Sequence, residues 1–138
     1  MPGGISELQR VQDAVGIAVA ADESLAEVPV VDFGAVSLST LVVKPSAIGH
    51  LEALTQLVTS HRVVVTSFID SAIGVTAALH VAAAVSATST ESLACGLATS
   101  SRFSSDTAAA PRISAGSLVV PTEPGLGITP FPDVVSAT

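Results

Sequence analysis

The stretch that decides the fold is LVVKPSAIGHLEAL, residues 41–54. It opens with a short apolar run that ends at Lys44, and a proline follows directly. Apolar residues then recur at the spacing that places side chains on one face of a helix, at Ile48, Leu51, Leu54 and Val58. A buried strand followed at once by an amphipathic helix is the repeating unit of a parallel α/β sheet.

The same pattern recurs on both sides of this unit. IAVAADES, residues 17–24, is an apolar run that ends in acids, and RVVVTSFIDS, residues 62–71, is a β-branched run that ends in polar residues. The first run does not alternate, which predicts a strand covered on both faces. An alanine-rich helix is predicted over 74–87, and ESLAC, residues 91–95, is a shorter fourth strand. The recurrence predicts an α/β fold with a parallel sheet.

The two ends of the chain differ from this pattern. SELQ predicts a helix with Ser6 as N-cap and Gln9 in the capping-box position, and Gly16 ends that helix. We therefore expect one domain over 1–138, with βα units over 1–95. Residues 96–138 are expected to form an irregular tail with a short extended segment, loosely held over the last six residues.

Composition excludes several classes of function. Twelve acidic residues against five basic ones give a net charge of −7, so a nucleic-acid surface is not expected. Hydrophobic residues make up 49 % of the chain, but no uncharged run reaches the roughly 18 residues of a membrane span, and no membrane partner is expected. No signal peptide is visible, and the single cysteine excludes an internal disulfide. A cytoplasmic location is the expectation.

Chemically distinct residues follow the three main strands at equivalent points. Asp22, Lys44 and Ser67 each come at or just after the carboxyl end of a predicted strand. In parallel α/β barrels the loops at this end converge on the active site. Because the three residues occupy equivalent positions at successive strand ends, they predict an active site there.

Lys44 is the only lysine in the chain. One interpretation lets its stem run along the sheet while the ammonium reaches solvent. The other gives it a role as a base, a Schiff-base former or a fixed cation beside developing negative charge. A chain that needed lysine only for solubility would have several, which favours the functional interpretation.

The acids before the next helix also have two interpretations. Asp22 and Glu23 are suited to cap that helix, because acids are favoured near a helix N-terminus. Alternatively, Asp22 supplies a carboxylate to Mg²⁺. The neighbouring Lys44 favours the second, because a metal and a cation together stabilise an enolate dianion.

The third strand end contains further polar residues. Ser67, Asp70 and Ser71 are candidates for binding a substrate carboxylate, although strand-end turns and an N-cap also explain them, Ser71 above all. Cys95 is interpreted as a small buried hydrophobic residue. The three histidines are interpreted as structural residues on helices: His50, His61 and His80.

With these residues in place, the chain resembles the carboxyl-terminal part of an o-succinylbenzoate synthase, a member of the enolase superfamily. IAVAADES, LVVKPSAIGHLEAL and VVVTSFIDSAIGVTAALHVAAAV are similar to the fifth, sixth and seventh barrel strands with their following segments. ACGLATSSRFSSD and GSLVVPTEPGLGI are similar to the eighth strand and the returning tail. The resemblance implies a partial TIM-like (β/α) barrel, about the last four βα units of the domain.

The resemblance implies a reaction. Such enzymes are cytoplasmic lyases of menaquinone biosynthesis that use Mg²⁺ to dehydrate 2-succinyl-6-hydroxy-2,4-cyclohexadiene-1-carboxylate to 2-succinylbenzoate. Carried over by position, Asp22 matches the third metal carboxylate and Lys44 the lysine on the second face of the substrate. Ser67 and the following turn, with Asp70 and Ser71, match the region that meets the succinyl side.

The chain departs from the family pattern in ways that have consequences. The Lys-x-Lys strand that supplies the base and two further metal carboxylates are not among its residues, and His50 and Ala98 stand where glycine is common. An incomplete barrel would expose two sheet edges. We therefore expect a fragment that is inactive alone, binds Mg²⁺ poorly, and self-associates or pairs with another barrel half.

Three other functions remain open on the sequence. Racemases, epimerases and cycloisomerases of the same superfamily share the strand-end residues. A lone lysine on a barrel strand is also how Schiff-base aldolases are built. A non-catalytic module that binds a partner through an exposed sheet face is the third.

Overall fold

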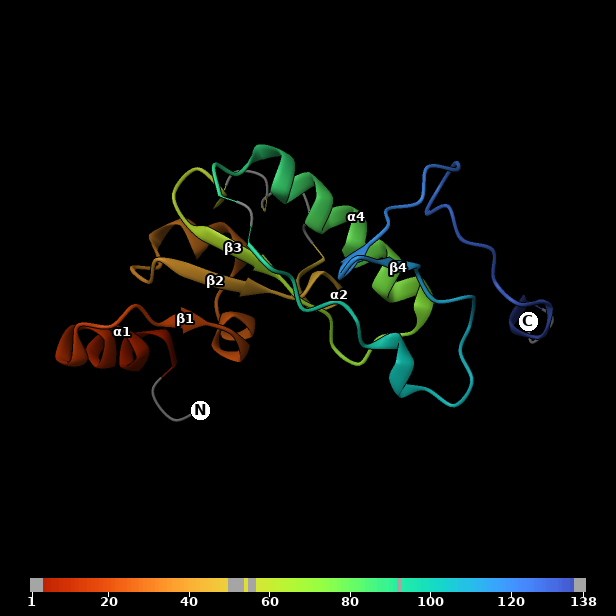
Figure 1. Cartoon of the computed structure of the whole chain (residues 1–138). Coiled ribbons are helices and arrows are strands. Elements are labelled where there is room, and N and C mark those ends of the chain that lie inside the picture. Colours follow the sequence, from red (N-terminus) through yellow and green to blue (C-terminus); the bar gives the residue numbers. More distant parts are fainter. Residues whose placement is uncertain (1–3, 50–53, 55–56, 92, 136–138) are drawn as a thin grey trace.

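A three-stranded parallel sheet lies at the centre of the protein. The computed structural model describes residues 4–49, 54, 57–91 and 93–135. Its strands β1 (Ala20–Ala21), β2 (Thr40–Val43) and β3 (Arg62–Val65) pair in chain order (Figure 1). The predicted α/β fold with a parallel sheet is confirmed.

Each strand presents one buried face and one open face. The register aligns Ala21 with Leu41 and Leu41 with Val63, so their side chains share a face. We call this face the helix face, because a helix covers it. All of its residues are buried: Ala21, Leu41, Val43, Val63 and Val65. None of those on the opposite face is buried: Ala20, Thr40, Val42, Arg62 and Val64. We call this second set, continued past the strand ends, the open face.

The first strand is shorter than predicted. Only Ala20 and Ala21 form β1, because the Val19 N–H donates to Oε1 of Gln12, 3.1 Å away, instead of joining the ladder. The prediction that this strand is covered on both faces is wrong: Ala20 is exposed, and Ile17 just before it has 67 % of its surface exposed. Only one side of this part of the sheet is covered.

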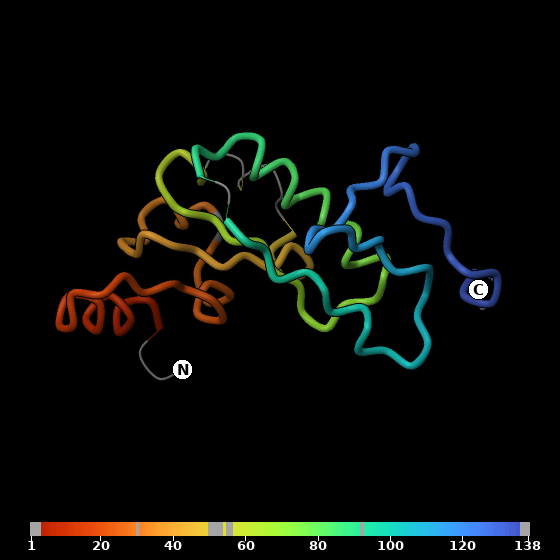
Figure 2. The backbone as a smooth tube through the Cα atoms, viewed as in Figure 1, coloured from red at the N-terminus to blue at the C-terminus, as the bar shows by residue number. Residues whose placement is uncertain are grey.

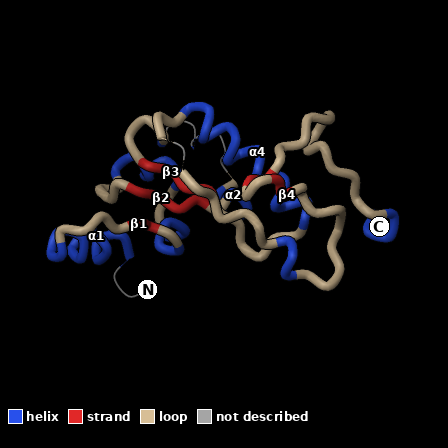
Figure 3. Tube along the Cα trace, in the orientation of Figure 1, coloured by secondary structure: helices blue, strands red, loops and turns tan. Residues whose placement is uncertain are grey.

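The long helix α4 (Ala72–Thr88) covers the helix face of the sheet (Figures 1 and 3). It includes the predicted range 74–87. Its buried residues belong to the same core as the strands and include Ala78, Leu79, Ala82 and Val85. Small alanines allow the helix to approach the sheet closely, which makes this layer the main hydrophobic core.

The start of α4 is capped from a distant segment. Ser71 occupies the N-cap position, as expected, but its side chain makes no capping hydrogen bond. Instead Oδ1 of Asp106 accepts a hydrogen bond from the Ala72 N–H at 2.8 Å and another from the Thr107 N–H at 2.6 Å. The bond from Ala72 is the main cause that lowers the pKa of Asp106. A carboxylate at this position also interacts favourably with the positive end of the helix dipole.

We expect Asp106→Ala to destabilise the protein by about 1 kcal/mol, the usual cost of losing an N-cap. Because the pKa of Asp106 is lowered in the folded state, its contribution is present above the unfolded value and is lost as pH falls through the folded value. Urea unfolding at pH 7 and at pH 3 measures both effects. A loss of stability in the variant that is the same at both pH values would contradict this role.

Shorter helices connect the strands. After β1 the chain forms two 3-10 helices, η1 (Glu23–Glu27) and η2 (Val30–Ala35), where one helix was expected after Asp22 and Glu23. After β2 comes α2 (Pro45–Ile48), which ends at Gly49 in the left-handed conformation. Leu54 of the predicted helical stripe is buried, whereas Leu51 and His50 lie outside the described residues.

The first helix, α1 (Gly4–Val15), packs beside η1. Ser6 lies inside it, so the prediction of Ser6 as N-cap is wrong. Gly16 ends the helix as predicted, with φ of 65° and its N–H donating to the Gln12 carbonyl at 2.9 Å. A positive φ at this position explains why the helix ends on glycine.

The predicted fourth strand is wrong. Residues 93–95 form no strand, and the only pairing beside β3 in the described part of this segment is a single parallel bridge between Thr66 and Gly96. Cys95 is exposed, so its interpretation as a buried hydrophobic residue is also wrong. The edge of the sheet beyond β3 is therefore paired at one point.

The remaining chain forms small elements and leads away from the sheet (Figure 2). They are η3 (Ser100–Arg102), the antiparallel strands β4 (Ile113–Ser114) and β5 (Ser117–Leu118), and α5 (Pro132–Val135). Residues 115 and 116 both have positive φ, as a two-residue hairpin turn requires. The last six residues were expected to be loosely held, but the first three of them form most of α5, and 136–138 lie outside the described residues.

Candidate active site

Asp22 and Lys44 meet at the carboxyl end of the sheet. Asp22 directly follows β1 and Lys44 directly follows β2, and the register puts both on the open face. Oδ1 of Asp22 and Nζ of Lys44 form an ion pair. The ends of two neighbouring parallel strands thus place an acid and a cation in contact with each other.

The ammonium of Lys44 is shielded from water. Its side chain is 14 % exposed, and Nζ lies 5.5 Å from the centre of the Phe68 ring. Burial lowers the pKa of Lys44. The interpretation that its ammonium reaches solvent is therefore wrong, because Nζ itself is buried. The ring face of Phe68 provides a favourable contact for the cation at this distance.

Asp22 does not act as a helix cap. It occupies the N-cap position of η1, but its side chain makes no capping hydrogen bond. Its carboxylate pairs with Lys44 through the buried Oδ1, and the side chain as a whole is 39 % exposed. Of the two interpretations of this acid, capping is therefore wrong, and a role at the strand end remains.

A small cavity of about 90 Å³ lies at this point. Its walls come from the strand ends and the short helices that follow them, and they include Asp22, Leu25, Val42, Lys44, Ile48 and Phe68. The lining is mostly apolar, and its charged members are the acid–ammonium pair and Glu23. Such a cavity keeps water from the two charges, which strengthens the attraction of the Lys44 ammonium both to Asp22 and to an anionic ligand.

Residues 1–134 match the model of a family described as enolase C-terminal domain-like. The chain belongs to this family. No curated protein matches it closely enough to count as a relative. Enolase-like C-terminal domains place their reactive groups at the carboxyl ends of parallel strands, where Asp22 and Lys44 lie in this chain.

The other predicted site residues do not line the cavity. The Ser67 hydroxyl lies 2.8 Å from that of Thr99, and Asp70 accepts a hydrogen bond from the Ser46 hydroxyl at 3.4 Å. Ser71 begins α4. Asp70 also lies against Gly74, where an added Cβ would come within 3.0 Å of the Asp70 Cβ. These contacts give the three residues local structural roles, and their part in substrate binding stays a prediction.

The described residues do not by themselves fit a magnesium site. Within the described ranges there is no group of three or more His, Cys, Asp or Glu side chains able to hold a metal ion. The one strand-end carboxylate, that of Asp22, is already balanced by the ammonium of Lys44. Mg²⁺ requires an octahedral set of oxygen ligands, so binding here would need oxygen donors beyond this pair.

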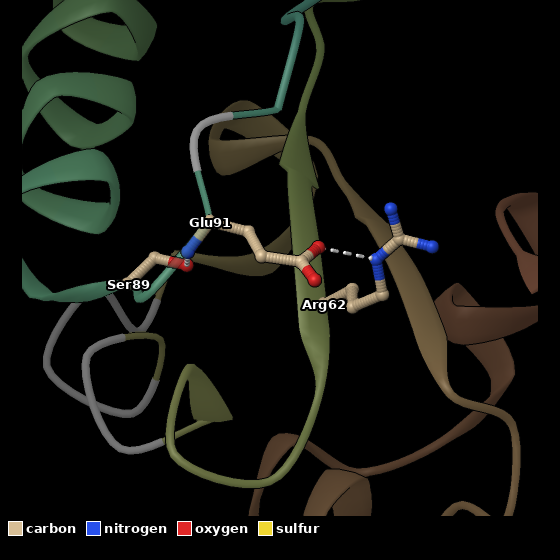
Figure 4. Close-up of polar contacts among 3 residues, drawn as sticks. All are labelled: Arg62, Ser89 and Glu91. Atoms are coloured by element: carbon tan, nitrogen blue, oxygen red, sulfur yellow. Dashed lines mark hydrogen bonds and ion pairs between the residues drawn. The ribbon is translucent and has the colours of Figure 1, made fainter.

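The opposite end of the open face has a different ion pair. Nε of Arg62 lies 2.9 Å from Oε2 of Glu91, and both side chains are more than half exposed (Figure 4). The Glu91 N–H donates a hydrogen bond to the Ser89 hydroxyl oxygen at 3.2 Å. An exposed pair of this kind contributes little stability. Arg62 therefore serves as a control cation on the same face.

Two histidines are bound to backbone carbonyls. Nε2 of His80 donates to the Leu126 carbonyl at 3.1 Å, and Nε2 of His61 donates to the Val36 carbonyl at 2.9 Å. His80 lies on α4 as predicted, whereas His61 precedes β3, so its placement on a helix is wrong. Each ring holds a backbone carbonyl distant in sequence by a hydrogen bond, which agrees with the interpretation of these histidines as structural residues.

None of the helices within the described ranges is both long enough and apolar enough to cross a membrane.

Proposed function

We propose that this chain carries the carboxyl-terminal part of an o-succinylbenzoate synthase barrel. The observation that supports it is the ion pair of Asp22 with Lys44, side by side at the carboxyl ends of adjacent parallel strands. The order β1-β2-β3 and the bridge at Gly96 agree with consecutive strands of a (β/α) barrel. The open face would then be the barrel interior.

In this proposal Lys44 acts as a fixed cation. The substrate is 2-succinyl-6-hydroxy-2,4-cyclohexadiene-1-carboxylate, which loses its α-proton and expels water to give 2-succinylbenzoate. Negative charge develops on the ring carboxylate as the proton leaves, and an ammonium in a dry cavity stabilises it strongly. The carboxylate of Asp22 orients Lys44 and favours its charged form, whereas burial disfavours that form by lowering the pKa of Lys44.

The pairing with Asp22 also bears on the alternative chemistry of Lys44. A Schiff base requires the neutral amine, which burial of Lys44 favours by lowering its pKa, whereas the ion pair with Asp22 favours the ammonium. The geometry therefore favours a fixed cation over an aldolase nucleophile. Racemases, epimerases and cycloisomerases of the superfamily use the same strand ends, and substrate tests separate them.

The proton-abstracting base is not Lys44 in this proposal. The family uses a Lys-x-Lys strand, and the chain contains a single lysine. We therefore expect no turnover by the chain alone and propose that it pairs with a second barrel half or with another copy. Sedimentation would then show a species larger than one chain. Mg²⁺ would require the further ligands of the completed barrel.

Calorimetric titration with 2-succinylbenzoate tests the proposal. We expect measurable binding at millimolar concentration or tighter, with no comparable binding of mandelate or an N-acylamino acid. Preferential binding of either of those compounds would assign the chain to another branch of the superfamily. Growth of a strain lacking the synthase, rescued by this chain alone, would refute the proposed inactivity.

A further inference from the structure

Three neighbouring strands end in one polar side chain each on the open face. Asp22 follows β1, Lys44 follows β2, and Thr66 follows β3. Val64 is in register with Val42. Thr66 and Lys44 each lie two residues further along their own strands. Alternation along the strands therefore places Thr66 beside Lys44, on the side away from Asp22.

The backbone fixes Thr66 firmly at this position. Its N–H donates to the Val43 carbonyl at 2.9 Å, which continues the parallel ladder next to Lys44. On the other side Thr66 bridges Gly96, where an added Cβ would come within 3.0 Å of Cγ2 of Thr66. The methyl group thus packs against a glycine. A side chain at residue 96 would displace it.

The hydroxyl of Thr66 has no hydrogen-bond partner among the residues that the structure describes. Oγ1 is buried, and no group in the described part of the chain forms a hydrogen bond with it. A buried hydroxyl without a partner destabilises the folded state, and valine would fill the same space at this strand end without that cost. Such an unsatisfied group beside Lys44, whose ammonium already pairs with Asp22, points to a ligand that satisfies the hydroxyl and also contacts the ammonium.

The neighbouring Ser67 differs in this respect. Its hydroxyl is within 2.8 Å of the Thr99 hydroxyl and donates to the Gly96 carbonyl at 3.4 Å. It follows Thr66 by one residue, so alternation directs it away from the open face. The third strand therefore offers the hydroxyl of Thr66, rather than that of Ser67, to a ligand at Lys44.

We propose that the Thr66 hydroxyl donates a hydrogen bond to the carboxylate of the bound substrate, whose charge Lys44 balances. This inference rests on the proposed function, because it takes the ligand to be an aromatic carboxylate. Thr66 is then a substrate-binding residue. Its hydroxyl is unsatisfied without the ligand and satisfied with it.

The test uses two substitutions and two measurements. In Thr66→Val we expect the melting temperature to rise by about 3 °C, because an unsatisfied hydroxyl is removed. We expect the same variant to bind 2-succinylbenzoate about tenfold more weakly, because a hydrogen bond to a charged group is lost. Thr66→Ser keeps the hydroxyl and should bind within about threefold of the unchanged chain.

Thr40→Val is the matched control. Thr40 lies on the same face at the opposite end of β2, so its substitution should leave the affinity unchanged. A structural hydroxyl at Thr66 would give a lower melting temperature in Thr66→Val that Thr66→Ser restores, and that result would overturn the inference. Unchanged affinity in Thr66→Val would overturn it as well.

The outcomes also separate this inference from the proposed function. If the unchanged chain binds 2-succinylbenzoate, and Lys44→Met weakens binding while Thr66→Val does not, only the role of Thr66 is refuted. If the unchanged chain does not bind 2-succinylbenzoate at millimolar concentration, the proposed function fails, and the role of Thr66 in it is refuted too.

Discussion

Lys44→Met is expected to weaken the binding of 2-succinylbenzoate by about a hundredfold. Methionine keeps most of the aliphatic stem but removes the ammonium, and a charge-assisted hydrogen bond in a shielded cavity is worth roughly 3 kcal/mol. The side chain of Lys44 is only 14 % exposed, so water screens this interaction weakly. Calorimetric titration of both proteins measures the change.

Arg62→Met provides the matched control for this substitution. It removes one positive charge from the same face of the sheet, but at the amino end of β3, where Arg62 pairs with Glu91 in solvent. The affinity of this variant should stay within about twofold of the unchanged chain. Equal weakening in the two variants would mean that net charge, and not the position of Lys44, controls binding.

Leu41→Ala is expected to cost about 2–5 kcal/mol of stability, the usual range for a buried leucine. Leu41 is fully buried in the central strand, between Ala21 and Val63 in register. Removing its side chain leaves a cavity in the core shared with α4. Denaturant unfolding followed by circular dichroism measures the loss.

Val42→Ala tests the two-faced character of the sheet. Val42 is the next residue along β2 and lies on the open face, where it is half-buried. We expect its substitution to cost less than half as much as Leu41→Ala, because less apolar surface is lost from the core. A cost for Val42→Ala as large as that of Leu41→Ala would show that both faces are covered in solution.

The strands around the site could be predicted because their local signals agree with the tertiary structure. TLVVK and RVVV are β-branched runs bounded by polar residues, and they form β2 and β3. The alanine-rich stretch of α4 was also predicted, since it has no glycine or proline in its interior after Gly74. The position of Lys44 at a strand end followed from these two elements.

Other features depend on contacts that sequence patterns do not contain. β1 is limited to two residues because Gln12 captures the Val19 N–H, and the start of α4 is capped by Asp106, which lies 34 residues after Ala72. The first contact spans seven residues and the second joins segments distant in sequence. Local propensity cannot indicate them.

Within the site, strand alternation was the signal that sequence reasoning missed. Ser67 was chosen because it is polar and follows β3, yet β3 ends at Val65 and Thr66 is the residue in phase with Val64. A shift of one residue exchanges the two faces of a sheet, so Thr66 and not Ser67 lies on the open face, while the part of Ser67 in substrate binding stays a prediction. Counting alternation from Val64 would have identified Thr66.

The central claim is that Asp22 and Lys44 interact with each other in one site. A double-mutant cycle with Asp22→Asn, Lys44→Met and the double variant measures this interaction through the free energy of unfolding. Because both residues are partly shielded, we predict a coupling of about 1 kcal/mol. Effects of the two substitutions that add to within about 0.3 kcal/mol would contradict the claim.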